Sequence, residues 1–146
     1  MQIREADHND LSGLLSLYTQ YHYSQMPKID SRIQAIWKQI MNDPNQHIVA
    51  GVLDGKIVST CVLVVVPNLT HSQRPYAIIE NVITDENYRK QGYASAVLNF
   101  AKQIAMKNGC YKIMLMTGSK LDSTLRFYEQ SGYNRHDKTG FIQWLD

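Results

Sequence analysis

Residues 79–95 read IENVITDENYRKQGYAS. They begin inside an apolar run, residues 76–84, which predicts a strand buried on both faces and therefore central in a sheet. A tight polar connection at residues 85–90 leads into residues 91–107, where small and apolar side chains recur at helical spacing. The stretch predicts a central strand joined by a short turn to the best-formed helix of the chain.

The segments on either side predict a mixed α/β fold. Asp54-Gly55 joins two β-branched runs and predicts a type I′ hairpin. The crossover through the helix at residues 91–107 should be right-handed and place two parallel strands in the sheet. Further strands are expected at residues 1–5, 47–53, 56–66, 111–117, 133–136 and 141–145, and further helices after Asp7, at residues 30–41 and at residues 123–130.

Composition and charge limit the classes of partner and cofactor that we expect for this protein. The 146 residues carry a formal net charge of only +2, which predicts neither a nucleic-acid partner nor a membrane partner. Residues 1–6 lack the apolar stretch of a signal peptide, and no run approaches the ~18 apolar residues of a spanning helix. Cys61 and Cys110 lack metal spacing, and the histidines are scattered, so we expect a cytoplasmic protein without a metal site.

The start of the helix at residues 91–107 is a candidate phosphate site. Helix starts carry unpaired N–H groups and about half a positive charge. Gly92 permits close approach of a ligand, and Arg89 and Lys90 add cations. The same residues also fit a tight turn with two solvated basic side chains. Neither a Walker-type loop nor a dinucleotide fingerprint is present.

Three motifs resemble the GNAT superfamily of acetyl-CoA-dependent N-acetyltransferases. Residues 89–94 (RKQGYA) match its R/Q-x-x-G-x-G/A signature, with Ala94 in place of the commoner Gly. Residues 127–133 (FYEQSGY) are similar to its F-Y-x-x-x-G-F/Y element, and residues 85–88 to its D-x-x-Y/F loop. The resemblance covers nearly the whole chain. It implies one acetyltransferase domain over residues 1–146, whose mostly antiparallel central sheet is flanked by helices and has a parallel pair of strands splayed around the CoA site.

The resemblance also implies how acetyl-CoA, as cosubstrate, is held. The pantetheine arm would pair with Val82, Ile83 and Thr84, and the Val82 N–H would hold the thioester oxygen. Arg89 would lie at the rim of the pyrophosphate site, and Ser123 and Arg126 are candidate contacts to the nucleotide end. The backbone amides that would cradle the pyrophosphate are those of Lys90, Gln91, Gly92, Tyr93, Ala94 and Ser95.

Two side chains are candidate proton-transfer groups. Tyr128 matches the family tyrosine that faces the CoA sulfur and would protonate the departing thiolate; alternatively it is a core tyrosine. Glu80, a carboxylate in an apolar strand, is the candidate base that deprotonates the amine, directly or through water. By strand periodicity it should share a face with Val82 and Thr84, with Asn81 on the other. A carboxylate satisfied by Arg74 or by a helix N-terminus is the alternative.

The acceptor is predicted to be a small-molecule amine, with a protein amine or a non-catalytic CoA-binding regulatory module as alternatives. Arg74 and His71 lie in a loop that either lines the acceptor pocket or is solvated. Further candidate acceptor contacts, with Tyr18 also readable as core, are Tyr18, Tyr21, His22 and Tyr23. Residues 141–145 would allow two copies to pair as a homodimer.

Overall fold

The computed structural model describes residues 1–21 and 25–146. The predicted acceptor contacts His22 and Tyr23 lie outside the described residues. The chain divides into two compact units, Met1–Met114 and Leu115–Asp146.

The sheet has five strands in the order β1-β2-β3-β4-β5, with antiparallel pairs from β1 to β4 and a parallel β4–β5 pair, which confirms the predicted fold class. Its strands are β1 (Gln2–Glu5), β2 (Gln46–Leu53), β3 (Lys56–Val66), β4 (Tyr76–Thr84) and β5 (Ile113–Leu115). The helices are η1 (His8–Asp10), α1 (Leu11–Thr19), α2 (Ser31–Asn42), α3 (Thr70–Gln73), η2 (Glu86–Tyr88), α4 (Tyr93–Lys107) and α5 (Asp122–Gln130).

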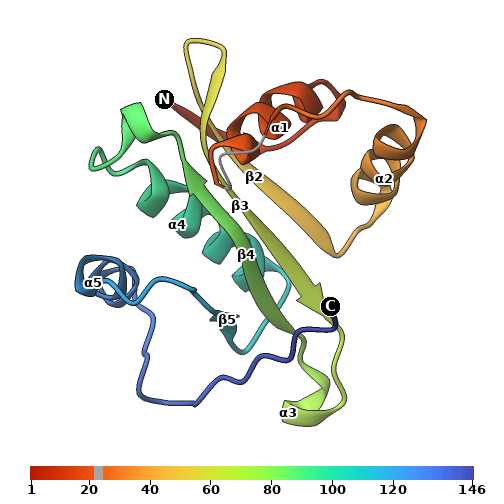
Figure 1. Ribbon diagram of the computed structural model, residues 1–146. Coiled ribbons are helices and arrows are strands. Elements are labelled where there is room, and N and C mark those ends of the chain that lie inside the picture. Colours follow the sequence, from red (N-terminus) through yellow and green to blue (C-terminus); the bar gives the residue numbers. More distant parts are fainter. Residues whose placement is uncertain (22–24) are drawn as a thin grey trace. The chain divides into compact units, whose positions relative to one another are not determined.

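Helices cover both faces of the sheet in the first unit (Figure 1). On one face, α4 buries the apolar stripe that the sequence predicts. Its buried residues are Val97, Leu98, Ala101, Ile104 and Ala105. On the other face, α1 and α2 pack over a cluster that includes Leu14, Leu17, Trp37, Ile48 and Val62. The central strand β3 is buried along most of its length because both helical layers rest on it.

The hairpin between β2 and β3 forms as predicted. Asp54 has a φ of 48° and Gly55 a φ of 78°, and a type I′ turn requires positive φ at both positions. This turn matches the right-handed twist of the two strands and fixes their pairing, Leu53 opposite Lys56.

A β-bulge interrupts β4 at Asn81. Glu80 lies opposite Val62 and Ile83 lies opposite Thr60, so β4 uses one more residue than β3 between these pairs. Asn81 takes a left-handed φ of 53°, a conformation that asparagine tolerates better than most residues. Sequence pattern alone does not reveal this bulge, because an asparagine in a strand is compatible with a regular register.

The bulge overturns the predicted face of Glu80. Val62 and Ile83 both belong to the cluster beneath α1 and α2, so Glu80, opposite Val62, lies on that side of the sheet. Thr84 lies on the α4 side instead, where its hydroxyl is 2.8 Å from that of Ser59. The expectation that Glu80 shares a face with Thr84 is therefore wrong, because one extra residue inverts the alternation.

The two closing strands predicted at residues 133–136 and 141–145 are not formed. In the described second unit, residues 131–146 are turns and irregular chain. The side chains of Phe141, Trp144 and Leu145 are 89%, 77% and 90% exposed. An isolated two-stranded hairpin is marginal in water, so an alternating apolar pattern alone does not form one here.

We predict that Asn81→Val lowers the free energy of unfolding by about 1–2 kcal/mol, because a β-branched residue is strained at positive φ. Asn81→Gly, which adopts this φ without strain, is the matched control and should unfold close to the wild type in urea. Equal midpoints for the valine and glycine variants would show that the bulge does not depend on φ at this position.

Candidate active site

The connection from β4 to α4 ends in a row of backbone amides that no capping side chain accepts from. Lys90 and Gly92 have left-handed φ values of 59° and 85°, and Gly92 is the N-cap of α4 with no side chain to cap it. The first bond into the helix runs from the Ala96 N–H to the Gly92 carbonyl, 3.0 Å away. The amides of Tyr93, Ala94 and Ser95 therefore precede any intrahelical partner and carry the positive end of the helix dipole.

The surroundings of this row are open and basic. A Cβ placed on Gly92 would meet no heavy atom within 4 Å among the described residues. Arg89, Lys90 and Gln91 are exposed beside it. The Arg89 side chain donates through Nε to the Thr84 carbonyl at 3.4 Å, which ties the loop back to the end of β4. The arrangement leaves room for an anion against the amides.

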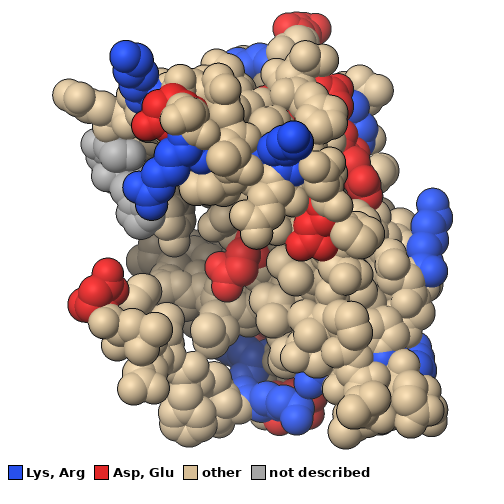
Figure 2. Space-filling model, turned by 90° about the vertical axis from the view of Figure 1, so that its right-hand side faces the viewer, with Lys and Arg blue, Asp and Glu red and all other residues tan. Residues whose placement is uncertain are grey.

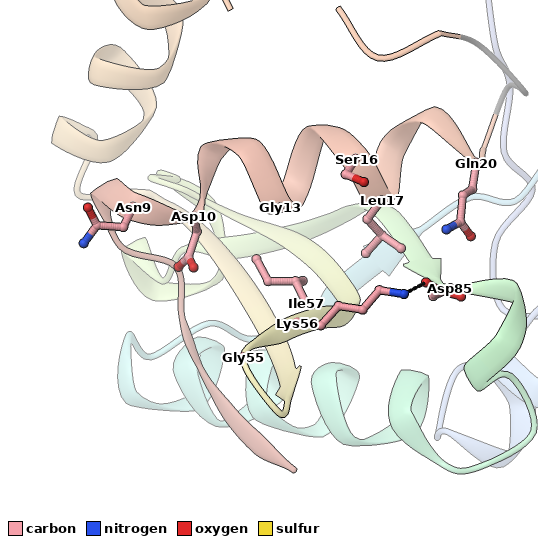
Figure 3. A pocket seen from close by; sticks show the side chains of 10 residues that line it. All are labelled: Asn9, Asp10, Gly13, Ser16, Leu17, Gln20, Gly55, Lys56, Ile57 and Asp85. Carbon is pink, nitrogen blue, oxygen red and sulfur yellow. Dashed lines mark ion pairs between the residues drawn. The ribbon is translucent and has the colours of Figure 1, made fainter.

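An ion pair between an exposed lysine and a buried aspartate fixes the start of this loop. Lys56 Nζ lies 2.7 Å from Asp85 Oδ2, and the Asp85 side chain is only 1% exposed (Figure 3). The other oxygen, Oδ1, accepts a hydrogen bond from the Asn87 N–H at 3.0 Å. Gln20, from α1, accepts a hydrogen bond from the Glu86 N–H at 3.1 Å. The hairpin and α1 together thus hold the turn η2 that precedes the amide row.

These side chains surround a cavity of about 350 Å³ between α1 and the β2–β3 hairpin (Figure 3). Both acids on its wall are paired: Asp85 with Lys56, and Asp10 with the Arg4 guanidinium at 2.6 and 3.0 Å. Burial alone would raise the pKa of Asp85, but its hydrogen bonds, that from Lys56 the strongest, bring the pKa below the usual range. The pairing of Lys56 with Asp85 was not predicted, since a lysine after a hairpin turn is usually solvated.

The β4 residues predicted to pair with the pantetheine arm differ in burial. Val82 and Thr84 are half-buried, whereas Ile83 is buried in the cluster under α1. Glu80 and Asn81 are exposed at the bulge. Glu80 is therefore accessible to solvent. A buried carboxylate satisfied by a partner would not be.

The Arg74 side chain binds backbone carbonyls at the end of α4. Its guanidinium donates from Nε to the Gly109 carbonyl at 3.1 Å and from Nη2 to the Cys110 carbonyl at 3.3 Å. It thereby joins the end of α4 to the start of β4. His71, from the same loop, stacks on Tyr111 with the ring centres 3.9 Å apart. Both side chains thus make structural contacts within the described chain, and their part in an acceptor pocket stays a prediction.

The remaining candidates lie together on α5 in the second unit. Tyr128 is half-buried between aromatic rings, with centres 5.0 Å from Phe127 and 6.2 Å from Tyr133. Arg126 forms an ion pair with Asp122 one turn earlier, and Ser123 is exposed in the first turn. The aromatic motif at residues 127–133 thus packs on itself at the end of this helix.

The described residues present neither a single-sign surface on the face drawn in Figure 2 nor a cluster of metal ligands. On the face drawn in Figure 2, acidic and basic side chains are interspersed on a mostly uncharged surface. The described histidine, cysteine and carboxylate side chains include no group of three placed to hold a metal ion. Among the described helices, none combines the length and apolar character needed to cross a bilayer.

The family follows from this fold and from the sequence. The model of the acetyltransferase (GNAT) family matches residues 11–133. The chain therefore belongs to the GNAT family of acetyltransferases, which use acetyl-CoA.

Three relatives span nearly the whole chain. A putative acetyltransferase from Agrobacterium tumefaciens is 38% identical, with a TM-score of 0.92 over 99% of each chain. A glucosamine 6-phosphate N-acetyltransferase from Trypanosoma brucei brucei is 27% identical, covering 94% of this chain and 92% of the relative. A structure described as a transcriptional regulator from Bacillus halodurans is 26% identical, with a TM-score of 0.86 over 98% of this chain and 99% of that one.

We predict that Asp85→Asn lowers the free energy of unfolding at pH 7 by about 2 kcal/mol, the scale of hydrogen bonds to a charged group. Because the folded-state pKa of Asp85 is lowered, the carboxylate stabilises the fold above its unfolded pKa near 4 and loses this effect as the pH falls through the folded value. As the pH is lowered from 5, the free energy of unfolding should therefore fall less in the variant than in the wild type. Asp10, whose pKa is lowered mainly by its hydrogen bond from Arg4, should contribute equally to the pH dependence of both proteins.

Urea unfolding at a series of pH values measures this difference. Glu86→Gln, at the neighbouring exposed carboxylate, is the control and should follow the wild-type pH profile. Parallel profiles for Asp85→Asn and the wild type would contradict the assigned role of the ion pair.

Proposed function

We propose that residues 1–146 form one catalytic domain that transfers the acetyl group of acetyl-CoA to a primary amine of a small molecule by direct attack. The observation that carries the proposal is the open row of amides at the start of α4, in a chain of the acetyltransferase family.

In this proposal the amides of residues 90–95 hold the CoA pyrophosphate, with Arg89 at the rim. Several N–H donors at one helix start, together with the helix dipole, favour a dianionic group. The pantetheine arm extends along Val82, Ile83 and Thr84. Ser123 and Arg126 contact the nucleotide end.

The reaction needs one oxyanion donor, one base and one acid. The amine attacks the thioester carbon while the Val82 N–H stabilises the developing oxyanion by ~3–4 kcal/mol. Glu80 takes a proton from the amine, directly or through water; its exposure at the bulge favours this role. The C–S bond breaks as the C–N bond forms, and Tyr128 gives its proton to the departing thiolate.

An acetylated cysteine is not part of this route. Cys61 is fully buried, and burial raises the pKa of its thiol to about 12. Since the thiolate is the nucleophile, a thiol of this pKa in a closed core is a poor acyl acceptor. Direct transfer between the two bound substrates is therefore favoured.

The small-molecule acceptor is supported by the Trypanosoma relative, which is named for an amino sugar phosphate. A non-catalytic CoA-binding regulatory module is the second candidate, and the Bacillus halodurans relative described as a transcriptional regulator favours it. The two differ in outcome: the enzyme releases CoA thiol in the presence of an amine, whereas the module binds CoA without releasing thiol.

We also propose that two copies pair as a homodimer and that the protein acts in the cytoplasm. The exposed apolar side chains at residues 141–145 support pairing, because such side chains are commonly covered at protein interfaces. Two unpaired cysteines fit a reducing compartment.

We predict that Gly92→Ala weakens CoA binding at least tenfold, because its Cβ would project into the space assigned to the pyrophosphate. Gly109→Ala is a matched control at the other end of α4: its φ is 75°, and its Cβ also meets nothing within 4 Å. Both should lose about 1 kcal/mol of stability to strain. Calorimetric titration with CoA measures the difference; equal affinities would contradict the assigned cradle.

Tyr128→Phe is expected to lower kcat by about 10²-fold, the lower end of the effect of a general acid, with little change in CoA affinity. The phenylalanine keeps the ring contacts with Phe127 and Tyr133 and removes only the hydroxyl. Thiol release under saturating acetyl-CoA and amine gives kcat. An unchanged kcat would remove Tyr128 as the acid.

A further inference from the structure

A mostly apolar groove of about 230 Å³ crosses the sheet face that α1 and α2 cover. Its walls include Leu15 from α1, Ile33, Ile36 and Trp37 from α2, and Val62 from β3. The lining side chains with polar atoms are Tyr18, Gln46, Asn81 and Trp37, and the indole N–H of Trp37 donates to the His8 carbonyl at 3.2 Å. Of the residues described, none that lines the groove is a lysine, arginine, aspartate or glutamate.

The groove ends beside the residues to which the transfer step is assigned. Asn81, at the bulge, lines it and is the chain neighbour of both Glu80, the proposed base, and Val82, the proposed oxyanion donor. Val62 lines it as well and lies opposite Glu80 in the β3–β4 register, on the same face of the sheet. The apolar lining therefore adjoins the proposed base.

This surface is open to water in part. Ile36 lines the groove and is 47% exposed, whereas Trp37, the next residue of α2, also lines it and is buried. Apolar side chains that converge on a groove and remain accessible are a feature of sites that bind an apolar group.

We propose that this groove binds the non-reacting part of the acceptor, and that the acceptor is a primary amine carrying an uncharged aromatic or aliphatic group. The inference rests on the proposed acetyltransferase function and specifies its substrate class. The amine lies at Glu80 and Val82. The hydrocarbon part is transferred from water into the groove between α1 and α2, which favours binding.

An anionic acceptor such as an amino sugar phosphate fits this groove poorly. A phosphate taken from water needs a cation or several donors, and the groove presents neither a lysine nor an arginine within the described chain. Arg74, from the loop that the sequence analysis offered as a possible wall of the acceptor pocket, donates to two backbone carbonyls. This chain therefore differs in expected acceptor from the relative named for glucosamine 6-phosphate.

The test compares four amines by kcat/KM for thiol release: 2-phenylethylamine, hexylamine, glucosamine and glucosamine 6-phosphate. We expect the two apolar amines to exceed both sugars at least tenfold. Ile36→Asp should raise the KM for 2-phenylethylamine at least tenfold and leave the KM for acetyl-CoA unchanged. Gln39→Asp places the same charge on an exposed part of α2 outside the groove lining and should stay within twofold of the wild type. A preference for either sugar, or equal KM values in the two variants, would overturn the inference.

A binding measurement without acetyl-CoA tests the groove assignment separately from catalysis. Trp144→Phe leaves Trp37, on the groove wall, as the remaining tryptophan, and its fluorescence should change on adding 2-phenylethylamine without acetyl-CoA. Adding Ile36→Asp should weaken this response at least tenfold. Saturable binding without thiol release would contradict the acetyltransferase proposal alone, whereas no response from Trp37 would overturn the groove assignment.

Discussion

Backbone amides that have no acceptor at the start of α4 are the feature on which the site depends. A helix cannot bond its own first N–H groups, and Gly92 supplies no capping side chain. In α2 the equivalent need is met by Asp30, whose carboxylate accepts the Ile33 N–H at 2.9 Å. At α4 the corresponding position is left open, so an anion outside the protein can take the place of the cap.

The rest of the first unit holds this opening in position. Asp85, fixed by Lys56 from the hairpin and by its hydrogen bond from the Asn87 N–H, anchors the loop between β4 and α4. On the α4 side, the buried stripe of the helix packs on β3 and keeps its start at the end of β4. On the opposite side, the bulge at Asn81 directs Glu80 toward α1 and α2. The proposed base thus lies on the α1 and α2 side of β4, whereas Thr84, one of the proposed pantetheine contacts, lies on the α4 side.

Local signals made the framework predictable. Asp54-Gly55 has few alternatives to a tight hairpin, and the apolar spacing of residues 91–107 matches one helical face, so both elements formed where expected. The bulge at Asn81, the pairing of Lys56 with Asp85 and the groove between α1 and α2 depend on residues far apart in the chain, and periodicity carries no information about them. The apolar pattern at residues 141–145 failed as a strand predictor because a strand also needs a neighbouring edge with which to pair.

A crystal structure of the protein with CoA tests directly whether the cosubstrate binds at the start of α4. We expect pyrophosphate oxygens within about 3 Å of the N–H groups that open α4, and the pantetheine arm alongside Val82. Pyrophosphate bound at any other helix or loop, with the amides of Tyr93, Ala94 and Ser95 still facing water, would contradict this assignment.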